Sequence, residues 1–196
     1  MSEIDIVTVY HRDSNYRLAQ VLERTLAETE DVPHTFIGVD NRKTNRGFAK
    51  GCNYGVKRGD SPIIGFLNPD VVIRGPFLGR ILQVFEDPET VITGSDFGKP
   101  KREIKTWGCQ TWVCGAAFFV RRDWFESRGG FDQQFVWGWE ETDLIRQAQV
   151  CGKKVRPIQL PIDHESPSDN SMQDVQYKRT WFDMGAMRFK KKWGMR

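Results

Sequence analysis

Asp70 is the first residue whose surroundings suggest chemistry, because it follows an apolar run that ends abruptly in a turn. The run Ile63–Leu67 shows no polar alternation, which is typical of a strand buried on both faces of a parallel sheet. Asn68-Pro69 then stops the strand. Ligands of open α/β sheets bind beyond the carboxyl ends of such strands, where a carboxylate can hold a divalent cation against a phosphate. The alternative is a turn whose aspartate caps the next element.

A second cluster places two tryptophans and three acids within seven residues, at the predicted start of a helix. Trp137 and Trp139 offer flat apolar faces on which a sugar ring can stack, and a carboxylate beside such a face can deprotonate a hydroxyl. The acids are Glu140, Glu141 and Asp143. The alternative is that they only cap the helix, because free amides and the helix dipole favour acids there.

A third candidate is His164, in a polar segment that follows a predicted strand. A single histidine with a structural role is the alternative. Together with Asp70, however, His164 would form a mixed nitrogen and oxygen site suited to Mn²⁺ or a similar ion.

Glycines recur every fourth residue at Gly47, Gly51 and Gly55. In a helix, this spacing creates a smooth face that lets the sheet or a ligand come close. The pattern is neither a dinucleotide fingerprint nor a phosphate-binding P-loop.

The elements that must position these residues alternate between strands and helices in the first half of the chain. Apolar patterning predicts strands over 4–9, 35–39, 63–67 and 91–93, and helices over 16–28, 48–56 and 77–85. The second half predicts strands over 112–120 and 154–160, helices over 122–128, 141–150 and 175–191, a charged loop over 98–105 and an irregular segment over 161–174. This alternation predicts an α/β fold with a central, mostly parallel sheet flanked by helices.

The bulk composition indicates one globular domain of 196 residues with a net charge of +3. No apolar stretch is long enough to span a bilayer, and the first residues lack a signal peptide's basic start, so a cytoplasmic location is expected. The four cysteines show no Cys-x-x-Cys spacing and are expected to be reduced and mostly packed thiols.

The positive charge is concentrated at one end of the sequence. Residues 186–196 contain five basic residues and no acid, whereas the remainder is nearly neutral. This distribution argues against a surface that coats nucleic acid. The basic segment is interpreted as a solvated helix end, a contact for a diphosphate, or a peripheral contact with an anionic membrane surface.

Taken together and in this order, these segments resemble the GT-A glycosyltransferases, specifically the rhamnosyltransferase-like members of inverting family 2. The Trp-Gly-Trp-Glu-Glu stretch 137–141 is also similar to the Trp-Gly-Gly-Glu-Asp segment of β-1,4-galactosyltransferases. The segments that carry the family resemblance are 45–55, Leu67-Asn68-Pro69-Asp70, 115–121, Gly129-Gly130-Phe131-Asp132, Glu140 to Leu144, His164 and Lys192-Trp193-Gly194.

The resemblance implies a metal-dependent inverting transferase that moves a sugar from a UDP-, dTDP- or GDP-sugar to a hydroxyl of a glycan, protein or lipid-linked acceptor. Mn²⁺ or Mg²⁺ would be the cofactor, and no nucleic acid would be involved. The whole chain, 1–196, would form one GT-A domain. Residues 1–95 would bind the nucleotide-sugar, 106–174 would form the acceptor and catalytic half, and 175–196 would form a basic helix.

The resemblance also assigns residues to the donor side. Asp70 and His164 would bind the metal, and Asn68, at the first position of the Asp-x-Asp-like motif, would meet the ribose. Asp40 would contact the base, within a very short connection to Asn45. The remaining donor-side residues would be Val9, Tyr10, Gly47, Lys50 and Asn53.

On the acceptor side, Glu141 aligns with the family's catalytic base, which is usually an aspartate. Glu140 and Asp143 are the alternative catalytic acids. Gly115, Trp137 and Trp139 would contact the acceptor.

Two other classes of function remain open. A sugar nucleotidyltransferase shares a similar sheet, but it would be expected to carry a glycine-rich basic loop after the first strand, and residues 10–14 contain no glycine. A non-catalytic sugar- or nucleotide-binding protein would tolerate loss of the acids, whereas this chain keeps Asp70, Glu141, Asp143 and His164.

Overall fold

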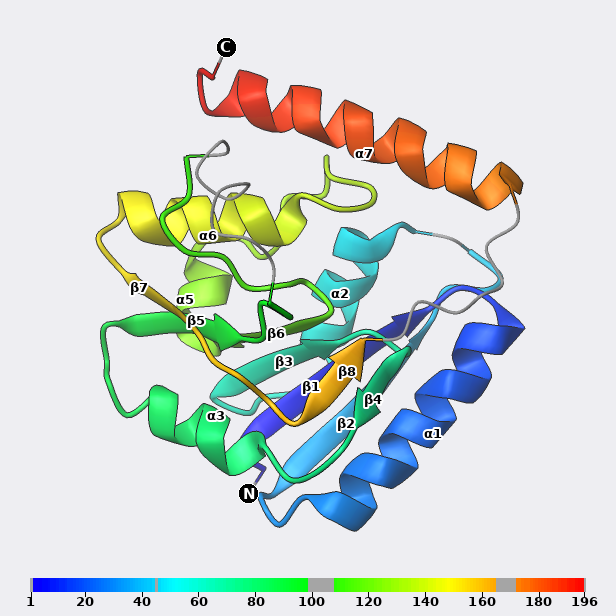
Figure 1. The fold of residues 1–196 in the computed structure, drawn as a ribbon, viewed down its shortest axis with the longest axis vertical. Coiled ribbons are helices and arrows are strands. Elements are labelled where there is room, and N and C mark those ends of the chain that lie inside the picture. The colour runs from blue at the N-terminus through cyan, green and yellow to red at the C-terminus, as the bar shows by residue number, and fades with distance from the viewer. Residues whose placement is uncertain (1, 45, 99–107, 165–171, 196) are drawn as a thin grey trace.

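The computed structural model describes residues 2–44, 46–98, 108–164 and 172–195 (Figure 1). The first half contains β1 (Ile4–Tyr10), α1 (Asp13–Thr29), β2 (His34–Asp40), α2 (Phe48–Val56), β3 (Ile63–Leu67), β4 (Val71–Ile73), α3 (Leu78–Val84) and β5 (Thr90–Gly94). The second half contains β6 (Ala117–Arg121), α5 (Arg122–Ser127), α6 (Glu140–Val150), β7 (Lys154–Pro157), β8 (Ile162–His164) and α7 (Met172–Lys192).

The main sheet has six strands in the order β2-β1-β3-β6-β5-β7. Strand β1 is parallel to β2 and β3, and β5 is parallel to β7, whereas β6 runs antiparallel to both of its neighbours. The predicted α/β fold with a mostly parallel central sheet is therefore confirmed. Helix α7 crosses one end of the molecule above α6 and α2 (Figure 1).

The centre of the core is aromatic and lies between β3, β6 and the segment that leads to α6. All five residues of β3 are buried. The ring of Phe66 lies 4.8 Å from that of Phe131 and 5.5 Å from that of Phe125, measured between centroids. Aromatic pairs of this kind stabilise a fold by more than their buried area accounts for, which helps to hold the carboxyl end of β3 in place.

The glycine face predicted for α2 packs against β1. A Cβ at Gly51 would lie 2.8 Å from Val9 Cγ1, and one at Gly55 would lie 2.5 Å from Val7 Cγ1. Both distances are too short for a real side chain, so the spacing of these glycines does let the sheet come close.

A two-stranded antiparallel sheet, β4 with β8, was not predicted. It pairs Val71 with His164 and Ile73 with Ile162. Each strand has only three residues, too few to show a periodic pattern, and the segment containing β8 was predicted to be irregular.

Two predicted strands are shorter than expected. Residues 112–116 are not in β6, because the Cys114 N–H donates to Ser95 O and the Ala117 N–H to Cys114 O, which turns the chain before the strand begins. The later strand ends at Pro157 instead of Leu160. Most of the predicted loop 98–105 lies outside the described residues.

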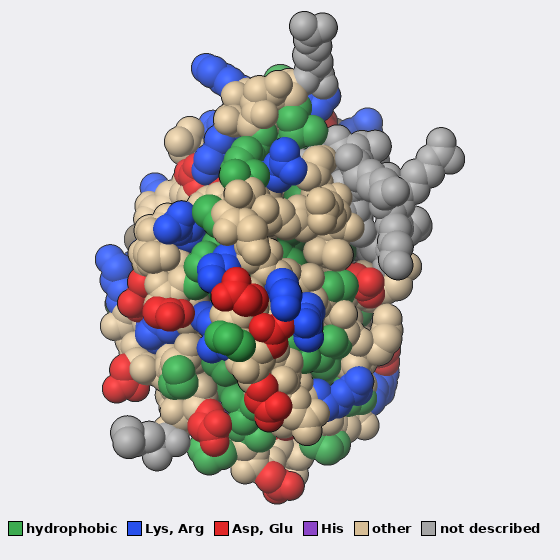
Figure 2. Space-filling model, turned by 90° about the vertical axis from the view of Figure 1, so that its left-hand side faces the viewer, with side chains coloured by type: hydrophobic (Ala, Val, Ile, Leu, Met, Phe, Trp, Pro, Cys, Tyr) green, Lys and Arg blue, Asp and Glu red, His purple; other side chains and the backbone are tan. Residues whose placement is uncertain are grey.

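The distribution of charged side chains on the surface agrees with the prediction that the chain outside residues 186–196 is nearly neutral. Basic side chains gather toward the upper end of the face in Figure 2, and acidic and basic side chains mix below them. All four cysteines are free. Within the described residues, no helix has the length and apolar character needed to cross a membrane.

Candidate active site

The two adjacent acids that begin α6 have different surroundings. Glu140 is buried as a whole residue, and the Oε2 atoms of both Glu140 and Glu141 are shielded from solvent. Glu141 is half-buried and lies against Gly115, where an added Cβ would be 3.3 Å from Glu141 Cδ. Burial raises the pKa of Glu140 well above its ordinary value, and the neighbouring Glu141 raises it further. Because Glu141 is less buried than Glu140, it is the better placed of the two to accept a proton from a bound substrate.

Backbone and side-chain contacts connect Glu141 to the turn after β3. The Asn68 N–H donates to Ala116 O at 3.0 Å, and Ala116 follows the Gly115 that lies against Glu141. The same loop is tied to α6, because Trp112 Nε1 donates to Thr142 Oγ1 at 3.3 Å. The predicted donor-side turn and the predicted base, far apart in the sequence, thus border one short loop.

Asp70 and His164 meet where β4 and β8 pair. His164 Nε2 lies 3.2 Å from Asp70 Oδ1, and the two side chains are 27% and 17% exposed. This arrangement leaves both partly open to solvent, and the ring of Phe97 lies 5.6 Å from the imidazole. One carboxylate and one imidazole fit a Mn²⁺ site whose other ligands come from water or phosphate. Within the described ranges, no group of three or more His, Cys, Asp or Glu side chains is arranged so that it could hold a metal ion.

Asp40 lies at the carboxyl end of β2, as predicted, but its carboxylate is bound by Arg42. Arg42 Nη2 donates to Asp40 Oδ2 at 2.7 Å, and the Arg42 N–H donates to Oδ1 at 2.9 Å. The hydrogen bonds from Arg42 lower the pKa of Asp40 to about 2. No role was predicted for Arg42. Tyr10 is opposite Asp40 in the register of β1 and β2, and Val9 is buried beneath α2.

The predicted donor-side residues on α2 and at its N-terminal cap fall into two groups. Gly47 has a positive φ of 81° and lies against Val136 O, and Lys50 is exposed. Asn53 instead serves the fold: its Nδ2 donates to Phe131 O at 2.8 Å, and its Oδ1 accepts the Phe131 N–H at 2.9 Å. Its amide is thus engaged with the backbone after Gly130, a use that its sequence context did not indicate.

The two tryptophans predicted to contact an acceptor are placed differently. Trp137 is 39% exposed, and its ring lies 6.4 Å from that of Phe182 on α7. Trp139 is only 6% exposed, packs against Phe182 and Phe189, and donates from Nε1 to Phe182 O at 3.0 Å. The interpretation of Trp139 as a sugar-stacking residue therefore needs correction, because its indole anchors α7. Trp139 also has a positive φ of 77°, which stores strain directly before the two acids.

Asp143 is buried, and its carboxylate accepts three side-chain hydrogen bonds. They come from Gln147 Nε2 at 2.8 Å, Lys192 Nζ at 2.8 Å and Trp193 Nε1 at 2.9 Å. Lys192 also donates to Asp132 at 2.7 Å, so it links the segment before α6 to α6 itself. A carboxylate with these partners is poorly suited to abstract a substrate proton. Asp143 therefore fits a structural role better than its predicted role as an alternative base.

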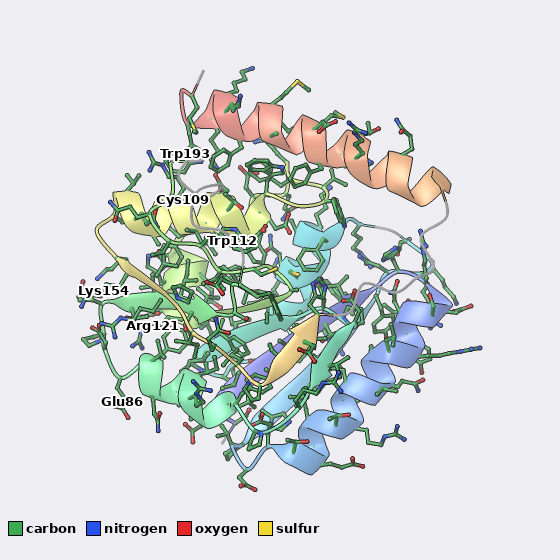
Figure 3. The ribbon with its side chains drawn as sticks, in the orientation of Figure 1. Glu86, Cys109, Trp112, Arg121, Lys154 and Trp193 are labelled. Carbon is green, nitrogen blue, oxygen red and sulfur yellow. The ribbon has the colours of Figure 1, made fainter. Side chains whose placement is uncertain are left out.

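Figure 3 shows Trp193 between the end of α7 and α6, with Cys109 and Trp112 below it in this view. The guanidinium of Arg146 is 5.6 Å from the Trp193 ring, and its Nη1 donates to Gly108 O. The end of α7 thus holds both α6 and the turn at Gly108.

We expect Lys192→Met to lower the free energy of unfolding by about 1–2 kcal/mol, because Asp143 loses its cation. This is less than for a fully buried ion pair, since Lys192 is partly solvated. Thermal denaturation should show a melting temperature lower by a few degrees. Lys191→Met is the matched control, since Lys191 is exposed. Equal losses in the two variants would contradict the role of the ion pair.

Comparison with solved structures identifies the fold class. The chain aligns with a mannosyltransferase from Pyrobaculum calidifontis in complex with GDP-Man and Mn²⁺, with a TM-score of 0.70 and 15% identity over 97% of this chain and 63% of that chain. It aligns with a Drosophila β-1,4-galactosyltransferase 7 variant in complex with manganese, UDP-Gal and xylobiose, with a TM-score of 0.58 and 15% identity over 90% of this chain and 79% of that one.

A third similar structure is S. aureus TarS 1-349 in complex with UDP, with a TM-score of 0.61 and 13% identity over 94% of this chain and 65% of that chain. The chain therefore spans less than two thirds of the mannosyltransferase and of TarS. At these identities the likeness defines the fold, which is that of the GT-A glycosyltransferases.

The family follows from the sequence itself. Residues 13–155 match the family described as Glycosyl transferase family 2, and the chain belongs to that family. None of the curated protein sequences matches the chain.

Proposed function

We propose that this protein is a metal-dependent, inverting glycosyltransferase that transfers a sugar from a nucleotide-diphosphate donor to an acceptor hydroxyl, with Glu141 as the base. The observation that carries the proposal is the contact path from Glu141 through Gly115 and Ala116 to the turn at Asn68. This path brings the candidate base and the donor-side turn to one loop at the carboxyl end of β3. Family membership and the nucleotide-sugars in the similar structures support the same reading.

The donor diphosphate would lie near Asp70 and His164, which would hold the divalent cation. When bound, that cation would offset the negative charge that develops on the leaving diphosphate. Asn68, half-buried at the turn, would meet the ribose.

The chemical step needs one base. The acceptor oxygen attacks the anomeric carbon from the face opposite the diphosphate, the bond to the diphosphate breaks with its electron pair, and Glu141 takes the hydroxyl proton. A single displacement of this kind inverts the anomeric configuration. The exposed ring of Trp137 is the proposed stacking surface for an acceptor that contains a sugar.

A panel of UDP-, dTDP- and GDP-sugars with Mn²⁺ tests this proposal without knowledge of the acceptor. We expect slow hydrolysis of a matching donor to the nucleoside diphosphate and free sugar, because water can replace the acceptor. Chelation of the metal should stop the release. Formation of a nucleoside triphosphate from the donor and pyrophosphate would instead indicate a nucleotidyltransferase, and binding without any turnover would indicate a non-catalytic protein.

A further inference from the structure

Helix α7 lies across one end of the molecule, and its inner side is firmly attached to the domain (Figure 1). Phe189 is 1% exposed, and Gly185 lies so close to Trp139 that an added Cβ would be 2.6 Å from the Trp139 Cδ1. Lys192 donates to Asp132 at 2.7 Å and to Asp143 at 2.8 Å. The helix is therefore held from one side, and its other side is left to solvent.

We call this other side the outer face of α7. Its members are exposed and recur every three or four positions along the helix, which places them on one side: Gln176, Arg179, Thr180, Asp183, Met187, Lys190 and Lys191. Three of these residues are basic and one is acidic, which leaves a net charge of +2. Basic and hydrophobic side chains lie together at this end of the molecule (Figure 2).

Apolar side chains are also exposed at this end. Met187, at 64%, is the most exposed of the large hydrophobic residues in the described part of the chain. Phe182 on α7 is 40% exposed, and Trp137, whose ring lies 6.4 Å from that of Phe182, is 39% exposed. Exposed apolar groups that border a cationic face are typical of a surface that meets a partner.

The structure changes which basic residues are available for such a partner. Lys192 is bound by the two acids of the body, and Arg188 donates to Gln134 O. Lys190 and Lys191 remain on the outer face, and Arg179 joins them from two to three turns earlier in the helix. These cations are therefore spread along the helix, and a flat, fluid surface can meet all of them without a complementary shape.

We propose that the outer face of α7 docks the protein reversibly onto an anionic membrane surface. Arg179, Lys190 and Lys191 would lie near acidic headgroups, which attract basic segments within about a Debye length. Met187 would enter the boundary between headgroups and acyl chains. The inference does not depend on the proposed function, because it concerns a side of the helix that faces away from the candidate active site's acids.

Sedimentation of the full chain with lipid vesicles tests the inference. One set of vesicles contains phosphatidylcholine alone, and the other contains phosphatidylcholine with about one third phosphatidylserine. We expect the affinity for the anionic vesicles to be higher by about fivefold for each net positive charge on the face, and to fall as salt is added. Equal binding to both sets, or binding to neither, would overturn the inference. Binding to soluble polyphosphate without binding to vesicles would overturn the assignment to lipid.

Charge variants locate the contact on α7. Lys190→Gln combined with Lys191→Gln should lower the affinity for anionic vesicles by about 25-fold, from two losses of about fivefold each. Asp183→Asn should raise that affinity by about fivefold, a gain that a folding defect would not produce. Unchanged or lower affinity in Asp183→Asn would overturn the location.

The matched control is Arg17→Gln combined with Arg24→Gln. It removes the same charge from two exposed residues of α1, which lies apart from α7 (Figure 1). This variant should bind anionic vesicles nearly as well as the unmodified protein. A loss equal to that of the double lysine variant would show that the net charge of the protein, and not the outer face of α7, governs the binding, and this outcome would overturn the inference.

Discussion

Replacing Glu141 by glutamine is expected to reduce sugar transfer by about 10²–10⁴-fold, the usual contribution of a positioned general base. Glutamine is nearly isosteric with glutamate, so the contact with Gly115 and the start of α6 should persist. The amide cannot accept the acceptor's proton, however, and this step alone should fail. Release of nucleoside diphosphate in the presence of donor and acceptor measures the loss, and circular dichroism verifies the fold.

The control for this prediction is Glu126→Gln, which makes the same chemical change at an acid of α5 whose side chain is 57% exposed. It should leave transfer unaffected. Glu140→Gln provides the sharper comparison. Burial raises the pKa of Glu140 and so favours its protonated form, which resembles an amide, so we expect a smaller loss than in Glu141→Gln. The reverse order of losses would assign the base to Glu140, and full activity in Glu141→Gln would remove Glu141 from that role.

Asp70→Asn is expected to weaken Mn²⁺ binding by more than roughly 100-fold. Loss of a residue that only hydrogen-bonds to a metal ligand typically costs roughly 10–100-fold, and Asp70 is proposed to bind the ion itself. The amide keeps the size of the side chain but removes the negative charge that a divalent cation requires. His164→Ala should also weaken Mn²⁺ binding, because only Asp70 would then remain of the two proposed protein ligands. Titration of the protein with Mn²⁺, followed by electron paramagnetic resonance of the free ion, measures both effects.

The matched control is Asp163→Asn, in the residue next to His164 on β8. Asp163 is 57% exposed and pairs with Arg74 at 2.7 Å, so it tests whether loss of any nearby acid weakens the ion's binding. Unchanged Mn²⁺ affinity in Asp70→Asn would contradict the metal site. Weakening in Asp163→Asn equal to that in Asp70→Asn would indicate a general electrostatic effect rather than coordination.

Local patterns predicted several elements with accurate bounds. The predicted bounds of α2 and β3 agree with the structure residue for residue. The glycine spacing of α2 and the unbroken apolar run of β3 are patterns among residues that are close in the sequence. Sequence periodicity shows such patterns directly. The same reasoning did not find β4 and β8, because three-residue strands show no period and each is stabilised by a partner that is distant in the sequence.

The sequence by itself determined the α/β class, the family and the set of acids from which we propose the base. The tertiary structure decided how those acids differ. Glu140 is buried, Glu141 borders Gly115, and Asp143 is bound by Lys192 and Trp193 from the far end of the described chain. An acid's readiness to accept a proton depends on its solvent exposure and its hydrogen-bond partners, and packing brings those partners from distant segments that no local pattern encodes.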